Sequence, residues 1–260
     1  MPISSIESMP PLRIGNTPLY TAKQELDGEE SFSVHFKVDS SNPTFSFKDR
    51  ASALVSAFAK EHDIKTIIAA STGNAGSSLA GICASQGQKS ILFVPENAPK
   101  AKLIQVLMYG AQLFPVIGNY DTAYDLSIRM TKEFGYYNRN TAYNPLTIEG
   151  KKTVSFELYK QLEHMPNKIF VSVGDGVILA GVYKGLEELF KLGLITEMPI
   201  VVAVQAEGSS NLIDNMNQDS PLFPASKTIA DSIAVDVPRN FYMAKDYLQK
   251  YHGEWVKVTD

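Results

Sequence analysis

The stretch TIIAASTGN, residues Thr66–Asn74, decides the fold class of this 260-residue chain. Its first five residues are apolar or β-branched, which is typical of a buried strand, and the small polar residues that follow are typical of a tight turn. A helix is predicted directly after the turn, over residues 75–86. A strand, a short turn and a helix in this order form the repeating unit of a parallel sheet.

The same alternation continues along the chain. Further strands are predicted over residues 90–94, 112–116, 168–173 and 200–205, and further helices over residues 100–109, 121–134 and 180–192. This spacing indicates parallel sheets with right-handed crossovers. Because the segment Tyr143–Gly150 separates two groups of elements, we expect two α/β units joined by a crossover. Residues 254–260 look like a strand followed by a helix cap without its helix, so we expect a chain that is cut short.

The composition excludes several classes of protein. The formal net charge is -4 and no basic run occurs, so we expect no nucleic-acid partner. The single cysteine, Cys83, lies in an apolar stretch and is expected to be a buried structural thiol. The histidines have no partner at ligand spacing, so no metal site is predicted; they are His35, His62, His164 and His252. Without a targeting segment or a long apolar run, the sequence predicts a cytoplasmic protein with no membrane partner.

Three turn-like segments lie where a strand would deliver the chain to a helix, at the sheet edge where ligands bind. The first, Asn42–Arg50, contains Lys48, which is either a reactive amine or a solvated lysine at a helix start. The second, Ser71–Gly76, offers backbone N–H groups to a carboxylate or is a plain helix-capping turn. The third, Val173–Gly181, is either a phosphate cradle of backbone amides or a common glycine turn. A reactive lysine, a carboxylate loop and a phosphate loop together are what a pyridoxal-phosphate (PLP) amino-acid enzyme requires.

Four motifs in this order resemble those of fold type II PLP enzymes: Gly15–Leu19, Ser46–Arg50, Ser71–Asn74 and the glycine loop at Gly174. The resemblance implies pyridoxal 5'-phosphate as cofactor, a small amino acid as substrate and a homodimer. It also implies two α/β domains, each a parallel sheet with flanking helices. Residues 1–45 and 144–260 would form a large PLP-binding domain, incomplete at its C-terminal end, and residues 46–143 a smaller substrate-binding domain.

The resemblance further implies a role for each motif. Lys48 would form the Schiff base with the cofactor and afterwards move the α-proton of the substrate. Asn74 would bind the 3'-oxygen of the cofactor. The remaining roles fall to two loops: Ser71, Thr72, Gly73 and Asn74 would hold the substrate carboxylate, and the amides of Gly174, Asp175, Gly176, Val177 and Ile178 would cradle the cofactor phosphate.

Within this superfamily the segment Asn144–Thr153 resembles the Asn-Pro-x-Arg-x-Glu-Gly-Gln-Lys-Thr stretch of threonine synthases. The resemblance implies conversion of O-phosphohomoserine to threonine and phosphate, a step of threonine biosynthesis. Two residues depart from the pattern: Thr147 stands where the pattern has arginine, and Asp175 where the glycine loop usually has asparagine. Either Lys151 and Lys152 compensate by binding the substrate, or the substrate is not phosphorylated.

Other functions therefore stay open. An ammonia-lyase acting on serine, threonine or diaminopropionate, or a β-replacing synthase, would use the same cofactor and turns. A truncated, non-catalytic PLP-binding protein is the hypothesis from another class, because the residue facing the pyridine nitrogen would lie beyond residue 260. Residues 228–235 either line the site or form a structural loop.

Overall fold

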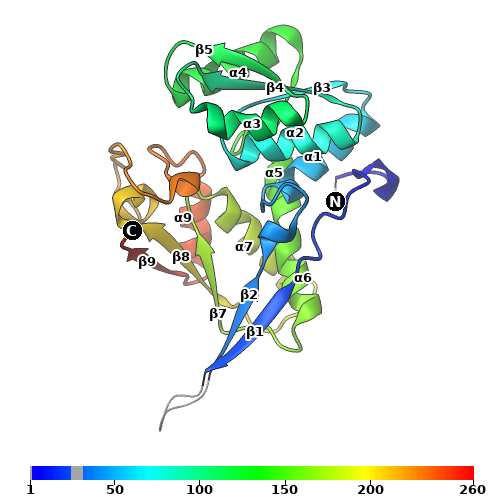
Figure 1. Ribbon diagram of the computed structural model, residues 1–260. Helices are drawn as coiled ribbons and strands as arrows, with labels where there is room; N and C mark the ends of the chain where they lie inside the picture. The colour runs from blue at the N-terminus through cyan, green and yellow to red at the C-terminus, as the bar shows by residue number, and fades with distance from the viewer. Residues whose placement is uncertain (1, 25–31) are drawn as a thin grey trace.

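The computed structural model describes residues 2–24 and 32–260, which form two parallel sheets, the helices around them and an antiparallel hairpin (Figure 1). The hairpin pairs β1 (Leu19–Gln24) with β2 (Phe32–Lys37) and projects from the body of the molecule. No helix within the described residues is long and apolar enough to cross a membrane. No group of metal-ligating side chains large enough to hold an ion occurs in the same part of the chain.

The first parallel sheet has the strand order β5-β4-β3-β6. Its strands are β3 (Thr66–Ala70), β4 (Lys89–Pro95), β5 (Gln112–Val116) and β6 (Tyr137–Asn138). The helices around it are α1 (Asp49–Glu61), α2 (Asn74–Ser85), α3 (Lys100–Met108) and α4 (Tyr120–Phe134). Fully buried apolar side chains such as Leu54, Ile67 and Leu79 fill the space between sheet and helices. Because the strands are parallel, β3 delivers the turn Ser71–Gly73 to the start of α2 at the carboxyl edge of the sheet.

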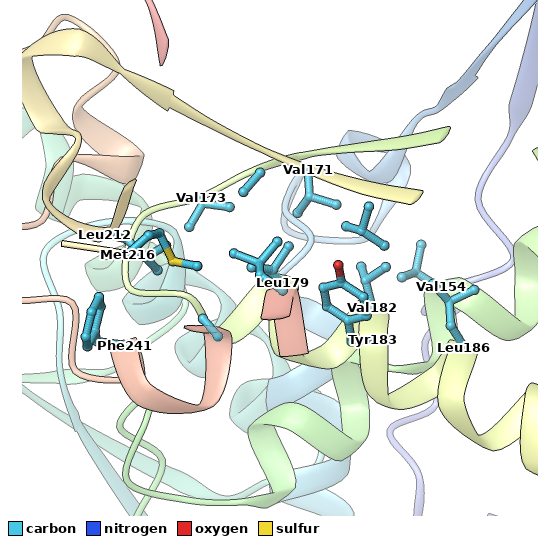
Figure 2. Packing of buried hydrophobic residues seen from close by; sticks show 14 of the residues in the cluster. Val154, Val171, Val173, Leu179, Val182, Tyr183, Leu186, Leu212, Met216 and Phe241 are labelled. Carbon is cyan, nitrogen blue, oxygen red and sulfur yellow. The ribbon is translucent and has the colours of Figure 1, made fainter. Parts of the chain in front are cut away.

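The second parallel sheet has the strand order β7-β8-β9. Its strands are β7 (Lys168–Ser172), β8 (Ile200–Ala206) and β9 (Glu254–Val258), and it packs on α7 (Val177–Lys191) and α9 (Phe241–Lys250). Figure 2 shows Leu179, Val182 and Tyr183 of α7 lying against Val171 and Val173 of the sheet. This core fixes the end of β7 relative to the start of α7, and the glycine loop connects the two. A short helix α8 (Asn211–Asp214) and the 3-10 helices η1 (Ile6–Ser8), η2 (Asp39–Ser41), η3 (Glu207–Ser209) and η4 (Asp231–Ile233) complete the structure.

Helix α5 (Leu146–Lys151) packs between α1 and α7 and links the two sheets, and α6 (Thr153–Gln161) follows it. Glycines permit the close approach. A Cβ atom on Gly150 would lie 2.2 Å from the carbonyl oxygen of Arg50 on α1, and one on Gly181 of α7 would lie 2.6 Å from the Cβ of Lys151. The rotational setting of α5 is therefore fixed by backbone contact on both sides.

The predicted fold class, α/β with parallel sheets, is confirmed. The strands predicted over residues 66–70 and 112–116 have the predicted bounds. Helix α7 begins at Val177, three positions earlier than predicted, and most of the expected crossover is helical as α5. Cys83 is fully buried, and burial raises the pKa of its thiol to about 12, as suits a structural residue. The domain boundaries near residues 45 and 143 stay a prediction.

Candidate active site

The predicted turns line one cavity of about 650 Å³. Lys48 precedes α1, the turn Ser71–Asn74 follows β3, and the loop Gly174–Gly176 follows β7. Segments far apart in the sequence, from both sheets, thus meet at one place. Ile178 also lines the cavity. Val177 is not among the lining residues.

Lys48 is held in place by the two charged residues that follow it. The carboxylate of Asp49 accepts hydrogen bonds from the backbone N–H of Thr44 at 2.7 Å and from its hydroxyl at 2.5 Å, which closes the turn before α1. The guanidinium of Arg50 donates to Asp39 at 2.7 Å and to Glu157 at 2.9 Å, which ties α1 to η2 and α6. Lys48 therefore enters the cavity from a turn with little freedom.

Burial shifts the Lys48 amine toward its neutral form. Burial lowers its pKa from the ordinary value of 10.5; the Asp175 carboxylate opposes this shift, and the positive charge of Arg139 adds to it. A lysine with a lowered pKa has a larger neutral fraction near neutral pH, and the neutral amine is both a nucleophile and a base.

The turn after β3 presents backbone donors to the cavity. The hydroxyl oxygen of Ser71 accepts hydrogen bonds from the N–H groups of Gly73 at 3.2 Å and Gly76 at 3.0 Å, so it shapes the turn. The N–H groups of Thr72, Asn74 and Ala75 donate to no acceptor among the described residues. Because this turn opens α2, the helix dipole adds to their attraction for an anion.

The glycine loop after β7 is a second set of backbone donors. Gly176 has a φ of +88°, and a Cβ there would lie 2.9 Å from the Cβ of Ala244, so no other residue fits without strain. The N–H of Val177 donates to the Asp175 carboxylate at 3.1 Å. The N–H groups of Gly174, Asp175, Gly176 and Ile178 have no acceptor in the described part of the chain.

The adjacent lysines at the C-terminal end of α5, Lys151 and Lys152, differ in position. Lys151 lines the cavity, is 1% exposed, and burial lowers its pKa to about 7. Lys152 does not line it: its ammonium makes ion pairs with Glu149 at 2.6 Å and with Glu188 at 2.8 Å. The structure thus separates the two lysines that were expected to bind substrate together, and Lys152 belongs to an ion-pair cluster outside the cavity. Thr147 is also buried away from the cavity and donates its hydroxyl to the Asn144 carbonyl at 2.8 Å.

Sequence reasoning missed Arg139, which follows β6 and lines the cavity. It is 0% exposed. Its Nε donates to the Ser52 hydroxyl at 3.1 Å and its Nη1 to the Thr141 hydroxyl at 2.8 Å, while its Nη2 has no hydrogen-bond partner. The strand before it has only two residues, too few for any periodic pattern, so the one available signal was an arginine within an otherwise uncharged stretch.

A further part of the cavity wall comes from α4 and from the segment that precedes α9. Residues 231–237, which overlap the segment considered for this role, line it, as do Tyr120 and Arg239. The Arg239 guanidinium pairs with the carboxylate of Asp121 on α4 and lies 3.9 Å from the ring centre of Tyr124. This contact joins the two halves of the wall.

Comparisons with known proteins agree with this geometry. Residues 11–260 match the family described as "Pyridoxal-phosphate dependent enzyme". A threonine synthase of Methanocaldococcus jannaschii is 33% identical over 268 residues, covering 100% of this chain and 65% of that protein. A threonine synthase of Mycobacterium tuberculosis is 31% identical, covering 95% of this chain and 67% of that protein. The chain thus spans about two thirds of the length of these relatives.

Solved structures share the fold at lower identity. A serine racemase of Dictyostelium discoideum superposes with a TM-score of 0.77 at 22% identity, covering 95% of this chain and 76% of that one. A diaminopropionate ammonia lyase of Escherichia coli gives a TM-score of 0.76 at 17% identity, covering 98% of this chain and 69% of that one. At these identities the likeness shows the fold.

Proposed function

Because the chain belongs to the pyridoxal-phosphate dependent enzyme family, we propose that it is a lyase acting on a small amino acid, with the threonine synthase reaction as its activity. That reaction converts O-phosphohomoserine and water to threonine and phosphate. The resemblance to fold type II PLP enzymes and to threonine synthases is confirmed by the family match and the relatives. The cofactor of the family is pyridoxal 5'-phosphate.

One observation carries the proposal: a buried amine and two sets of unpaired backbone donors meet in one cavity. The residues fit the cofactor. Lys48 would hold it covalently, the loop from Gly174 to Ile178 would hold its phosphate, and Asn74 would bind its 3'-oxygen. Since the N–H of Val177 already donates to Asp175, the other amides of the loop would take the larger share of the phosphate.

The protein groups have distinct roles in the proposed reaction. When bound, the cofactor supplies an electron sink for the bond that breaks at the substrate Cα. The turn at Ser71–Asn74 would hold the substrate carboxylate and so orient the Cα–H bond toward the Lys48 amine. Burial keeps a fraction of that amine neutral, which lets its Nζ take the proton from Cα and return it further along the chain of the substrate.

Two alternatives share this site. Thr147 offers no guanidinium to the cavity, and Asp175 adds a negative charge to it, so an ammonia-lyase or β-replacing synthase with an unphosphorylated substrate is the second candidate. A non-catalytic PLP-binding protein is the third. We also propose a homodimer in the cytoplasm.

The test uses absorbance and product analysis. Wild-type protein incubated with PLP should show the visible band of a lysine-bound cofactor, Lys48→Ala should lose it, and Lys184→Ala, which changes a lysine outside the cavity, should keep it. Persistence of the band in folded Lys48→Ala would refute the assignment. Phosphate released from O-phosphohomoserine supports the synthase, whereas ammonia and a keto acid from serine, threonine or diaminopropionate support the lyase alternative. A band without any turnover supports the non-catalytic protein.

A further inference from the structure

We propose that Arg139 and Lys151 form a subsite for a second anionic group at the far end of the substrate side chain, and that this group is a phosphate ester. The inference rests on the proposed function and goes beyond it, because it names residues that select the substrate. Neither the glycine loop nor the turn after β3 is part of this subsite.

Arg139 is a buried cation without an ion-pair partner among the described residues. Burial lowers its pKa, and the nearby Asp175 carboxylate opposes that shift without forming an ion pair. Arg139 is 0% exposed, and in the described residues its guanidinium forms no ion pair and donates only to the hydroxyls of Ser52 and Thr141. Its free Nη2 belongs to a side chain that lines the cavity. Arginine stays charged under all ordinary conditions, and an unpaired buried charge destabilises a protein. A buried guanidinium with an unpartnered nitrogen, in a side chain that lines a cavity, is therefore suited to an anionic ligand.

Lys151 supplies a second cation to the same cavity. It is 1% exposed and, within the described ranges, its ammonium has neither an ion pair nor a hydrogen bond. Burial lowers its pKa, the Asp175 carboxylate opposes this shift, and the charges of Arg139 and Lys48 add to it, so these groups are near neighbours. One dianion between Arg139 and Lys151 would relieve the repulsion.

The position of Lys151 on α5 supports a phosphate rather than a neutral group. Residues 147 and 151 are four apart in this helix and lie on the same face. The threonine synthase pattern has arginine at the first of these positions and glutamine at the second, whereas this chain has Thr147 and Lys151. Lys151 thus brings to the cavity a positive charge that the pattern does not have at this position.

The other anions of the proposed complex have their own binding groups. Backbone amides of the glycine loop serve the cofactor phosphate, and those of the Ser71–Asn74 turn serve the substrate carboxylate. Among the acidic residues in the wall, Asp121 pairs with Arg239 and Asp236 accepts the N–H of Ser226. Asp175 accepts the N–H of Val177 and is close enough to raise the pKa of both Arg139 and Lys151, but it forms an ion pair with neither. Arg139 and Lys151 remain for a further anion. A phosphate dianion matches two cations better than a single carboxylate does.

The test compares three ligands that differ only at the far end of the side chain. L-2-Amino-5-phosphonopentanoate ends in a phosphonate that cannot be eliminated as phosphate, L-2-aminoadipate ends in a carboxylate, and L-norvaline ends in a methyl group. Binding to PLP-loaded protein is measured by calorimetry, together with the change in the visible band. For wild type we expect the phosphonate to bind at least about tenfold more tightly than norvaline, and more tightly than aminoadipate.

The variants separate this subsite from cofactor binding. Lys151→Gln introduces the residue that the threonine synthase pattern has at this position, and Arg139→Met removes the guanidinium; both should lose the preference for the phosphonate while keeping the cofactor band. Arg139→Lys should keep part of the preference for the phosphonate. Lys184→Gln, which changes a residue outside the cavity, should keep the whole preference.

Three results would overturn the inference. Wild-type protein that shows the band but binds phosphonate and norvaline equally has no such subsite. A stronger preference for aminoadipate would replace the phosphate with a carboxylate. Folded variants that lose the cofactor band would make these residues counter-ions of the cofactor. Absence of the band in wild type is a different failure, because it removes the proposed function itself.

Discussion

Replacing Lys151 with methionine should stabilise the cofactor-free protein, and the gain should shrink as the pH rises. Methionine keeps the volume of the buried stem and removes the charge. Burial lowers the pKa of Lys151 from 10.5 to about 7. At about 1.4 kcal/mol per pKa unit, the charged amine costs the folded protein about 5 kcal/mol wherever both states are protonated.

The direction of the pH dependence of stability follows from whether the folded or the unfolded chain keeps the proton on Lys151. Below pH 7 the amine is charged in the folded and the unfolded chain, so the folded protein bears the whole cost. Between pH 7 and 10.5 the folded protein has released the proton while the unfolded chain still holds it, so wild type gains stability as the pH rises. The advantage of Lys151→Met should therefore fall from about 5 kcal/mol at pH 6 to about 2 kcal/mol at pH 9.

Thermal unfolding of both proteins at pH 6 and pH 9, followed by circular dichroism, measures this change. For a chain of this size, about 5 kcal/mol corresponds to a difference in melting temperature on the order of 10 °C. Lys48, whose pKa burial also lowers, is present in both proteins, so only its charge interaction with Lys151 differs between them. An equal difference at the two pH values, or a less stable variant at both, would contradict the buried, unpaired state of this amine.

Two further predictions concern the glycine loop and α5. Asp175→Asn removes a negative charge from the cavity while an amide oxygen can still accept the N–H of Val177, so PLP should bind about tenfold more tightly in equilibrium dialysis; unchanged or weaker binding would mean that the carboxylate does not repel the cofactor phosphate. Gly150→Ala places a Cβ atom 2.2 Å from the carbonyl oxygen of Arg50, and should lower the free energy of unfolding by about 3 kcal/mol or prevent folding; a variant as stable as wild type would show that α1 and α5 can move apart.

The sequence predicts most of the parallel sheets because their longer strands are short apolar runs bounded by turns. Thr66–Ala70 and Gln112–Val116 have these features and were predicted with their observed bounds. β6 has only two residues and lacks these features. The sequence therefore does not predict that Arg139 directly follows a strand. Helix α7 starts at Val177 because Gly176 turns the chain with a positive φ, and hydrophobic periodicity does not register such a turn.

The sequence also could not predict which of the two adjacent lysines, Lys151 or Lys152, faces the cavity. Adjacent residues of a helix point about 100° apart, so only one of them can face the cavity. Which one does is set by the rotation of α5, and the backbone contact of Gly150 with α1 and the approach of Gly181 on α7 fix that rotation. This information resides in the packing of three helices that lie far apart in the sequence, and no local pattern contains it.

The buried cations also connect stability with ligand binding. Lys48, Arg139 and Lys151 come from three separate elements that the fold holds rigidly around one cavity, and burial lowers the pKa of each. The Asp175 carboxylate offsets part of this cost, but no ion pair neutralises the three cations within the described residues. A fold that keeps such charges is less stable than it would be with apolar residues in their place. Anionic ligands that bind only the folded state restore this stability by mass action. The residues that select an anionic ligand are thus the same ones that make the empty protein gain stability as the pH rises.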